Sequence, residues 1–178
     1  CILDYAHTPE ALKLCLENLK EQFSGRKINI VLGCGGDRDK SKRNIIGKIA
    51  NKYCDRIYLT DDNPRNENPK KIRDTIKKNI KKNKFFEIPN RKKAIENAVR
   101  YLCSNDILVV SGKGHENVQD YGKKKIFFSD KNIILNSIKL KNNLLSNDIK
   151  INIMKESEEA KKISKTIKLQ NASINSKE

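Results

Sequence analysis

Hydrophobic residues in the first 140 positions alternate between short apolar runs and longer stretches with helical spacing. The apolar runs, which predict strands, are residues 1–3, 28–32, 57–60, 85–88, 107–110 and 125–128. The amphipathic stretches, which predict helices, are residues 9–23, 45–50, 69–80, 94–102 and 130–138. Strands and helices that alternate at this spacing favour an α/β fold, in which a mostly parallel sheet is covered by helices on both faces.

Four of the predicted strands are followed directly by clusters of polar residues. These clusters occupy residues 4–7, 33–43, 61–65 and 112–116. In a parallel sheet, ligands bind outside the carboxyl ends of the strands. We therefore expect the four loops to meet at one edge of the sheet and to form a single site.

The second cluster is rich in glycine and in basic residues. Its sequence GCGGDRD at residues 33–39 matches neither the P-loop pattern nor the dinucleotide-binding Gly-x-Gly-x-x-Gly pattern. The glycines permit close approach of a ligand to the backbone. Arg38, together with Lys40, Lys42 and Arg43, would attract a carboxylate or a phosphate. An ordinary glycine turn with solvated charges is the alternative interpretation.

The third cluster is Asp61-Asp62-Asn63-Pro64-Arg65, which places two carboxylates, an amide and a guanidinium on one turn stiffened by proline. Arginine offers a planar fork to a carboxylate, and aspartate accepts hydrogen bonds from an ammonium group. Such a loop could hold both ends of an amino acid. Because Asp, Asn and Pro all favour turns, a plain turn followed by a helix cap explains the same residues.

The fourth cluster, GKGHE at residues 112–116, combines flexible backbone with a cation, a base and an acid. It fits either a ligand clamp or a catalytic dyad. His115 and His7 are the only histidines of the chain. Neither has a visible partner for general-base catalysis, so no catalytic residue is assigned. No further ligand stands at the spacing of a metal site, and we expect none.

The net charge of the chain is +16, from 38 Lys and Arg against 22 Asp and Glu. An excess of this size raises the question of nucleic-acid binding. The lysine-rich stretch 77–84 has no interleaved aromatic residues for base stacking, and the chain has no zinc-finger or RNP motif. We expect a solvated basic surface and no nucleic-acid partner; a basic nucleic-acid-binding α/β module is the alternative.

The lengths of the apolar runs and the arrangement of the cysteines indicate the cellular location of the protein. No run approaches the ~20 apolar residues of a membrane helix, and no secretory leader is recognisable. The five cysteines are scattered without a Cys-x-x-Cys pair, as in a reduced protein. The sequence therefore predicts a cytoplasmic protein without a membrane span. Because the chain opens at Cys1 without a methionine, we expect it to be part of a longer protein.

Four motifs, taken in order, resemble the C-terminal domain of the Mur ligase family. They are DYAHTP at 4–9, GCGGDRDK at 33–40, DDNPR at 61–65 and GKGHE at 112–116. The resemblance covers residues 1–140 and points to the MurE branch, which adds the third residue of the peptidoglycan stem peptide. It implies a Rossmann-like C-terminal domain, preceded in the family by a UDP-sugar-binding domain and a central P-loop ATPase domain.

The resemblance also implies a reaction. In the MurE branch, ATP phosphorylates the D-glutamate carboxylate of UDP-MurNAc-L-Ala-D-Glu, and the amine of meso-diaminopimelate attacks the acyl phosphate. ATP and Mg²⁺ are bound mainly by the central domain. This chain resembles only the C-terminal domain, so we expect it to be inactive by itself.

The matched motifs place the amino-acid substrate on particular residues. By resemblance, meso-diaminopimelate binds to Arg38, Asp62, Asn63, Pro64, Arg65, Gly112 and Glu116. Two guanidinium groups would then meet the two carboxylates of this substrate. Lysine lacks the distal carboxylate and would leave Arg65 desolvated and unpaired, which is costly. Lysine-adding members of the family tend to lose this arginine. We expect diaminopimelate, with a lysine-adding Mur ligase as the alternative.

Asp4 and His7 match the family segment that reaches the nucleotide when the C-terminal domain closes. A carboxylate there suits ribose hydroxyls, whereas a cap near the helix is the alternative role for Asp4. Domain closure would bring the amine to the acyl phosphate and exclude water.

Residues 141–178 are rich in Lys, Asn, Ser and Glu and thin in hydrophobic residues. They are typical of a linker or of the start of another unit. Residues 172–178 resemble the opening strand of a Mur ligase N-terminal domain, so a fusion to MurF, the next ligase of the pathway, is one interpretation. A disordered extension or an arbitrary boundary is the other.

Overall fold

The structure is a computed structural model that describes residues 1–147. The chain divides into two compact units, Cys1–Ile138 and Lys139–Glu178. In the second unit, residues 139–147 are helical. The predicted boundary at residue 140 stays a prediction. The interpretation of residues 141–178 as a linker or as the start of a MurF ligase falls mainly outside the described residues and stays a prediction as well.

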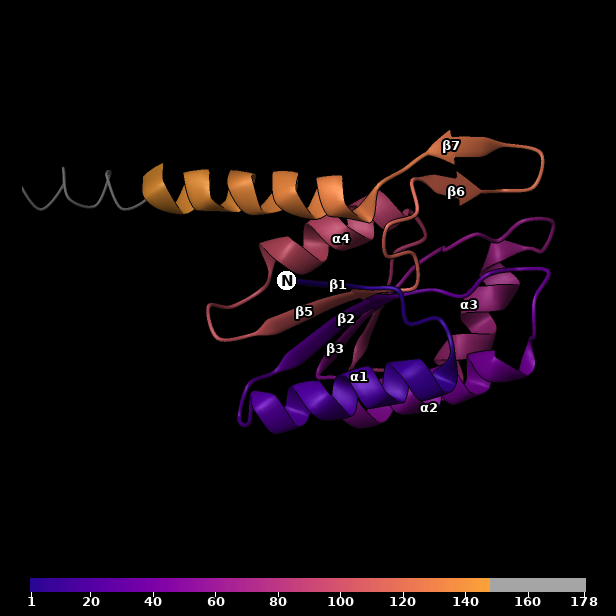
Figure 1. Ribbon diagram of the computed structural model, residues 1–178, viewed down its shortest axis with the longest axis horizontal. Helices are drawn as coiled ribbons and strands as arrows, with labels where there is room; N and C mark the ends of the chain where they lie inside the picture. Colours follow the sequence, from indigo (N-terminus) through magenta and orange to yellow (C-terminus); the bar gives the residue numbers. More distant parts are fainter. Residues whose placement is uncertain (148–178) are drawn as a thin grey trace, which may run out of the picture. The chain divides into compact units, whose positions relative to one another are not determined.

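Five strands form the central sheet of the first unit (Figure 1). In spatial order they are β1 (Ile2–Asp4), β5 (Ile107–Ser111), β2 (Ile28–Leu32), β3 (Arg56–Leu59) and β4 (Phe85–Glu87). Every neighbouring pair is parallel. The central strands β2 and β5 are buried along their whole length, as strands of a sheet covered on both faces must be. The predicted α/β fold with a parallel sheet is confirmed.

Helices cover both faces of this sheet (Figure 1). Helices α1 (Pro9–Gln22), α2 (Ser41–Tyr53) and α3 (Pro69–Lys77) pack on one face, and α4 (Arg91–Arg100) and residues 130–138 of a final helix pack on the other. Successive side chains of a strand point to opposite faces. Ile30 of β2 therefore belongs to the first core and its neighbour Val31 to the second.

The starts of α1 and α3 agree with their sequence signals. Thr8 caps α1 by accepting a hydrogen bond from the Ala11 amide at 3.2 Å, and Pro9 occupies the first turn. Helix α3 likewise begins at a proline, but it ends at Lys77, so the helix predicted over 69–80 was too long. Ile80 is nevertheless buried in the core.

A small hairpin stands apart from the main sheet. The predicted strand at 125–128 is β7 (Lys125–Phe127), which pairs antiparallel with β6 (Val118–Asp120) in a separate two-stranded sheet. No hydrophobic pattern marks β6, because its buried residue is the polar Gln119 while Val118 is exposed. The hydrophobic pattern is thus inverted in this strand.

Candidate functional site

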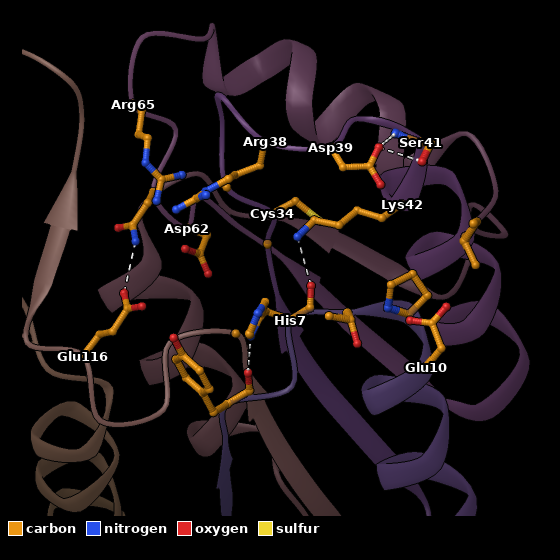
Figure 2. Close-up of a pocket in the computed structure, with 18 residues that line it drawn as sticks. His7, Glu10, Cys34, Arg38, Asp39, Ser41, Lys42, Asp62, Arg65 and Glu116 are labelled. Carbon is orange, nitrogen blue, oxygen red and sulfur yellow. Dashed lines mark hydrogen bonds between the residues drawn. The ribbon is translucent and has the colours of Figure 1, made fainter.

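The polar loops meet at the carboxyl edge of the sheet, where they line a cavity of about 660 Å³ (Figure 2). The predicted site residues that line it are His7, Arg38, Asp62, Asn63, Arg65, Gly112 and Glu116. They follow β1, β2, β3 and β5 in the chain, so the expected convergence of four loops is observed. Asp4 and Pro64 do not line this cavity; Asp4 lies at a neighbouring depression beside α1.

The glycine-rich loop and the turn after β3 are bonded to each other. The Gly36 amide donates to the Asn63 carbonyl at 2.8 Å, and Nη1 of Arg65 donates to the Gly36 carbonyl at 2.7 Å. A Cβ atom at Gly36 would lie 1.9 Å from the Pro64 carbonyl oxygen. The close approach therefore requires glycine, and Pro64 shapes the site through its backbone.

Two guanidinium groups face the cavity. Figure 2 shows Arg38 and Arg65 directed toward the region of Asp62. Arg65 has a φ of 51°, in the left-handed region that side chains other than glycine rarely adopt. Its amide donates to the Asp120 carbonyl at 3.0 Å, which holds this conformation. Arg38 is exposed and has no hydrogen-bond or ion-pair partner among residues 1–147, so its charge is free for a ligand.

Asn63, Lys113 and Glu116 form a hydrogen-bonded cluster in the wall of the cavity. The Asn63 Nδ2 donates to Oε2 of Glu116 at 3.1 Å. The Lys113 Nζ donates to Oδ1 of Asn63 at 2.8 Å and to Oε2 of Glu116 at 3.2 Å. The Lys113 side chain has no exposed surface, whereas that of Glu116 is 36% exposed. The lysine thus lies behind the two residues that face the cavity.

Gly112 and Arg91 both approach the carboxylate of Asp62. Gly112 has a φ of 109°, and a Cβ atom there would lie 2.7 Å from Oδ2 of Asp62, so only glycine fits. The Nη1 of Arg91 lies 4.0 Å from the same oxygen. Arg91 is fully buried and donates to both carboxylate oxygens of Asp130, at 2.9 Å and 2.6 Å. Burial alone would lower the pKa of Arg91, but Asp130 raises it, so the guanidinium stays charged beside Asp62.

The hairpin strand β6 donates hydrogen bonds to the turn after β3. Nε2 of Gln119 donates to the carbonyls of Asp61 and Asp62, at 3.3 Å and 2.8 Å. The Asp120 amide donates to Oδ1 of Asn63 at 3.0 Å. Sequence reasoning missed these residues, because nothing local marks a contact between residues so far apart in the chain.

Asp61 differs from its neighbour Asp62, because it is tied to the scaffold. Its carboxylate pairs with Arg73 of α3, and Arg73 also donates to Glu87 at 2.9 Å. Burial raises the pKa of Asp61, while the hydrogen bonds and charge of Arg73 oppose that rise. Asp61 does not line the cavity.

The basic residues of the glycine-rich loop also differ in whether they are bonded to other residues of the fold. Arg43 is buried and pairs with Glu67 through two hydrogen bonds, at 2.8 Å and 3.0 Å. It also donates to the Gly35 carbonyl at 3.1 Å. The Nζ of Lys42 donates to the His7 carbonyl at 3.0 Å, which joins the loops after β1 and β2. Arg43 therefore shapes the loop, and Arg38 is left to face a ligand.

The loop after β1 carries an aromatic cluster at the rim. The Tyr5 ring lies 4.9 Å from the ring of His7 and 5.4 Å from that of His115. Nδ1 of His7 lies 2.9 Å from the Tyr5 carbonyl. Oδ1 of Asp4 accepts a hydrogen bond from the Ala6 amide at 3.2 Å, a local contact of the kind expected of a loop cap. The Cys15 side chain of α1 also hydrogen-bonds to the Asp4 carboxylate.

Metal binding finds no support in the part of the chain that is described. Within residues 1–147, no three His, Cys, Asp or Glu side chains are grouped so that they could hold an ion. Cys34 lines the cavity, but burial raises the pKa of its thiol to about 12, which leaves it protonated and unreactive.

These observations define a class of protein: an α/β domain whose edge cavity presents both guanidinium and carboxylate groups, as the binding of a zwitterionic ligand requires. The family described as "Mur ligase, glutamate ligase domain" matches residues 1–114. The chain belongs to this Mur ligase family.

Individual relatives agree with this assignment. A UDP-N-acetylmuramoyl-L-alanyl-D-glutamate--2,6-diaminopimelate ligase of Rickettsia montanensis is 48% identical over 139 residues, 78% of this chain and 29% of the relative. A protein of the same name from Buchnera aphidicola subsp. Baizongia pistaciae is 50% identical over 142 residues, 79% of this chain and 28% of the relative. A solved structure of a ligase with this name is 37% identical, with a TM-score of 0.73 over 79% of this chain and 29% of that chain. The chain thus spans less than a third of the length of these relatives.

Proposed function

We propose that this chain is the C-terminal, amino-acid-binding domain of an ATP-dependent ligase that adds meso-diaminopimelate to UDP-MurNAc-L-Ala-D-Glu in peptidoglycan synthesis. One observation carries the proposal. The guanidinium groups of Arg38 and Arg65 and the carboxylates of Asp62 and Glu116 line the same cavity. Diaminopimelate has two carboxylates and two amines, so its charges complement these four side chains.

The whole reaction requires more than this chain. In the proposed full-length enzyme, ATP activates the D-glutamate carboxylate as an acyl phosphate, and one amine of diaminopimelate attacks it. ATP and Mg²⁺ would be held mainly by a central domain. The role of this chain is to bind and orient the diamino acid and to exclude water when the domains close. A cytoplasmic location is proposed as well, because the five cysteines are free, as in a reducing compartment.

The loop after β1 is the proposed nucleotide side of the site. His7 lines the cavity between Glu116 and Glu10 (Figure 2), and Asp4 lies in the adjoining depression. In this proposal the Asp4 carboxylate accepts hydrogen bonds from ribose hydroxyls in addition to its contact with the Ala6 amide.

Arg65 is the proposed basis for choosing diaminopimelate over lysine. Its guanidinium is held by the Gly36 carbonyl and faces the cavity, where the distal carboxylate of the substrate would neutralise it. Lysine has no such carboxylate and would leave the guanidinium desolvated without a counter-charge. A site that pairs its own charge with a charged group of the substrate strongly rejects an analogue without that group.

The test is substrate choice in the full-length enzyme. Arg65→Ala should lower kcat/KM for meso-diaminopimelate by about 100-fold and reduce the preference over lysine to within about tenfold. Arg56→Ala is the matched control, because Arg56 is an exposed arginine at the opposite end of β3. If Arg65→Ala kept the full preference for diaminopimelate, the proposed role of Arg65 would be wrong. A wild-type enzyme that prefers lysine would support the lysine-adding alternative.

A further inference from the structure

We propose that Lys113 is a positioning residue, which fixes the Asn63 amide and the Glu116 carboxylate in the orientations that bind the diamino acid. This inference rests on the proposed function and extends it. It concerns a side chain that neither lines the cavity nor has exposed surface. The role would therefore be exerted through its two partners and not by contact with substrate.

The ammonium group of Lys113 lies where it must be paired. A charged group without exposed surface is stable only when its donors are satisfied. Lys113 has two such contacts, with Oδ1 of Asn63 at 2.8 Å and with Oε2 of Glu116 at 3.2 Å. Both partners belong to the cavity wall, so the cost of burying this charge is balanced at the site itself.

The contacts leave the Asn63 amide only one orientation. Its Oδ1 accepts from Lys113 and from the Asp120 amide, at 2.8 Å and 3.0 Å, which uses both lone pairs. Its Nδ2 must then point to Glu116, where it donates at 3.1 Å. A flipped amide would place two N–H donors against the Lys113 ammonium. One N–H of Asn63 remains for a substrate carboxylate.

The same contacts orient Glu116. Its Oε2 accepts from both Lys113 and Asn63, so the carboxylate is held at one oxygen. The other oxygen, Oε1, stays available for the ammonium group of a ligand. Lys113 thus fixes the orientation of one donor and one acceptor on the cavity wall. Preorganised polar groups of this kind lower the cost of binding, because they lose no freedom when the ligand arrives.

The experiment uses the full-length enzyme with Lys113→Met, which keeps most of the length of the side chain and removes its donors. We expect KM for meso-diaminopimelate to rise about tenfold or more, with kcat and KM for ATP changed by less than about threefold, because the lost interactions act on ground-state binding. Lys84→Met is the matched control. Lys84 is a half-buried lysine whose Nζ also makes two hydrogen bonds, to the Asn51 and Cys54 carbonyls at 3.0 Å each, and it does not line the cavity.

A double-mutant comparison separates positioning from general stability. In an Asn63→Ala/Glu116→Ala background both hydrogen-bond partners of Lys113 are gone, so Lys113→Met should change KM by less than about twofold. An equally large effect in both backgrounds would overturn the proposal, as would an unchanged KM in the single variant. If Lys113→Met does not fold, Lys113→Gln, which keeps one donor without the charge, is measured in the same way. A wild-type enzyme that does not use diaminopimelate would refute the proposed function instead.

Discussion

Charged residues at the carboxyl edge of the sheet fall into two groups according to burial. Arg43, Arg91 and Lys113 are buried and paired with Glu67, Asp130 and Glu116, respectively. Arg38 is exposed at the cavity and has no partner among the described residues. The difference follows from electrostatics. A buried charge must be neutralised within the fold, whereas water solvates an exposed charge until a ligand binds. Among these four basic residues, burial thus separates the scaffold charges from the ligand-binding charge.

Glu67 provides a pH prediction at this scale. The Arg43 hydrogen bonds lower the pKa of Glu67 from 4.5 to about 2. Because the pKa is lower in the folded state, the stabilisation is complete above pH 4.5 and is lost as the pH falls toward about 2. The free energy of unfolding should therefore decline through this window, and Glu67→Gln should make the decline shallower in urea titrations at a series of pH values.

Glu21→Gln is the control for this experiment, since it removes an exposed carboxylate of α1. It should leave the slope nearly as in the wild type. An identical slope in Glu67→Gln and in the wild type would show that the Arg43–Glu67 pair does not govern acid stability.

The elements around the site are held together by polar contacts as well as by the two hydrophobic cores. Arg91 at the start of α4 bonds to Asp130 at the start of the final helix and to the Ser111 carbonyl at the end of β5. The hairpin strand β6 is bonded in turn to the loop after β3 through Gln119. The contact with Ser111 lies next to Gly112, and the contact of Gln119 is with Asp62 itself; Gly112 and Asp62 both line the cavity. The final helix and the hairpin therefore support the site, although neither carries a predicted ligand-binding residue.

The buried Arg91–Asp130 pair can be tested by removing one partner and then both. Arg91→Met leaves the Asp130 carboxylate buried without a counter-charge and should cost about 3–5 kcal/mol in unfolding free energy. The double variant Arg91→Met/Asp130→Leu removes both charges and should recover most of that loss. Urea unfolding of the three proteins measures the difference. A double variant no more stable than the single one would contradict this account of the pair.

At the scale of the whole molecule, the charge of +16 does not define the function. Of the lysines considered for nucleic-acid binding, Lys77 pairs with Asp74 and Glu87, and Lys84 donates to two backbone carbonyls. Within residues 1–147, no helix is long and apolar enough to cross a membrane. Membership of the Mur ligase family, and the cavity that carries its motifs, favour the ligase interpretation over a basic nucleic-acid-binding module.

The chain by itself should bind the diamino acid without turning it over. It spans 29% of the Rickettsia relative, so the parts that would activate the D-glutamate carboxylate lie elsewhere in the proposed enzyme. Given ATP, Mg²⁺ and both substrates, the isolated chain should release no phosphate above background. Calorimetry should detect binding of meso-diaminopimelate with a Kd above about 0.1 mM, because the other domains of the proposed enzyme do not close over the site. Phosphate release by the isolated chain would refute the proposed division of labour.

The sequence by itself determined the layered fold and the edge at which the site lies. The apolar runs at 28–32 and 107–110 marked the central strands, because a strand buried on both faces is mostly apolar. Polar motifs after the strands then indicated a common site, since parallel strands end at one edge. Tertiary structure alone decided which charges are free. Arg38 and Arg43 look alike in the sequence, yet one is exposed and the other is paired with Glu67. The roles of Lys113, Arg91 and Gln119 likewise come from contacts with residues distant in the chain, which no local pattern encodes.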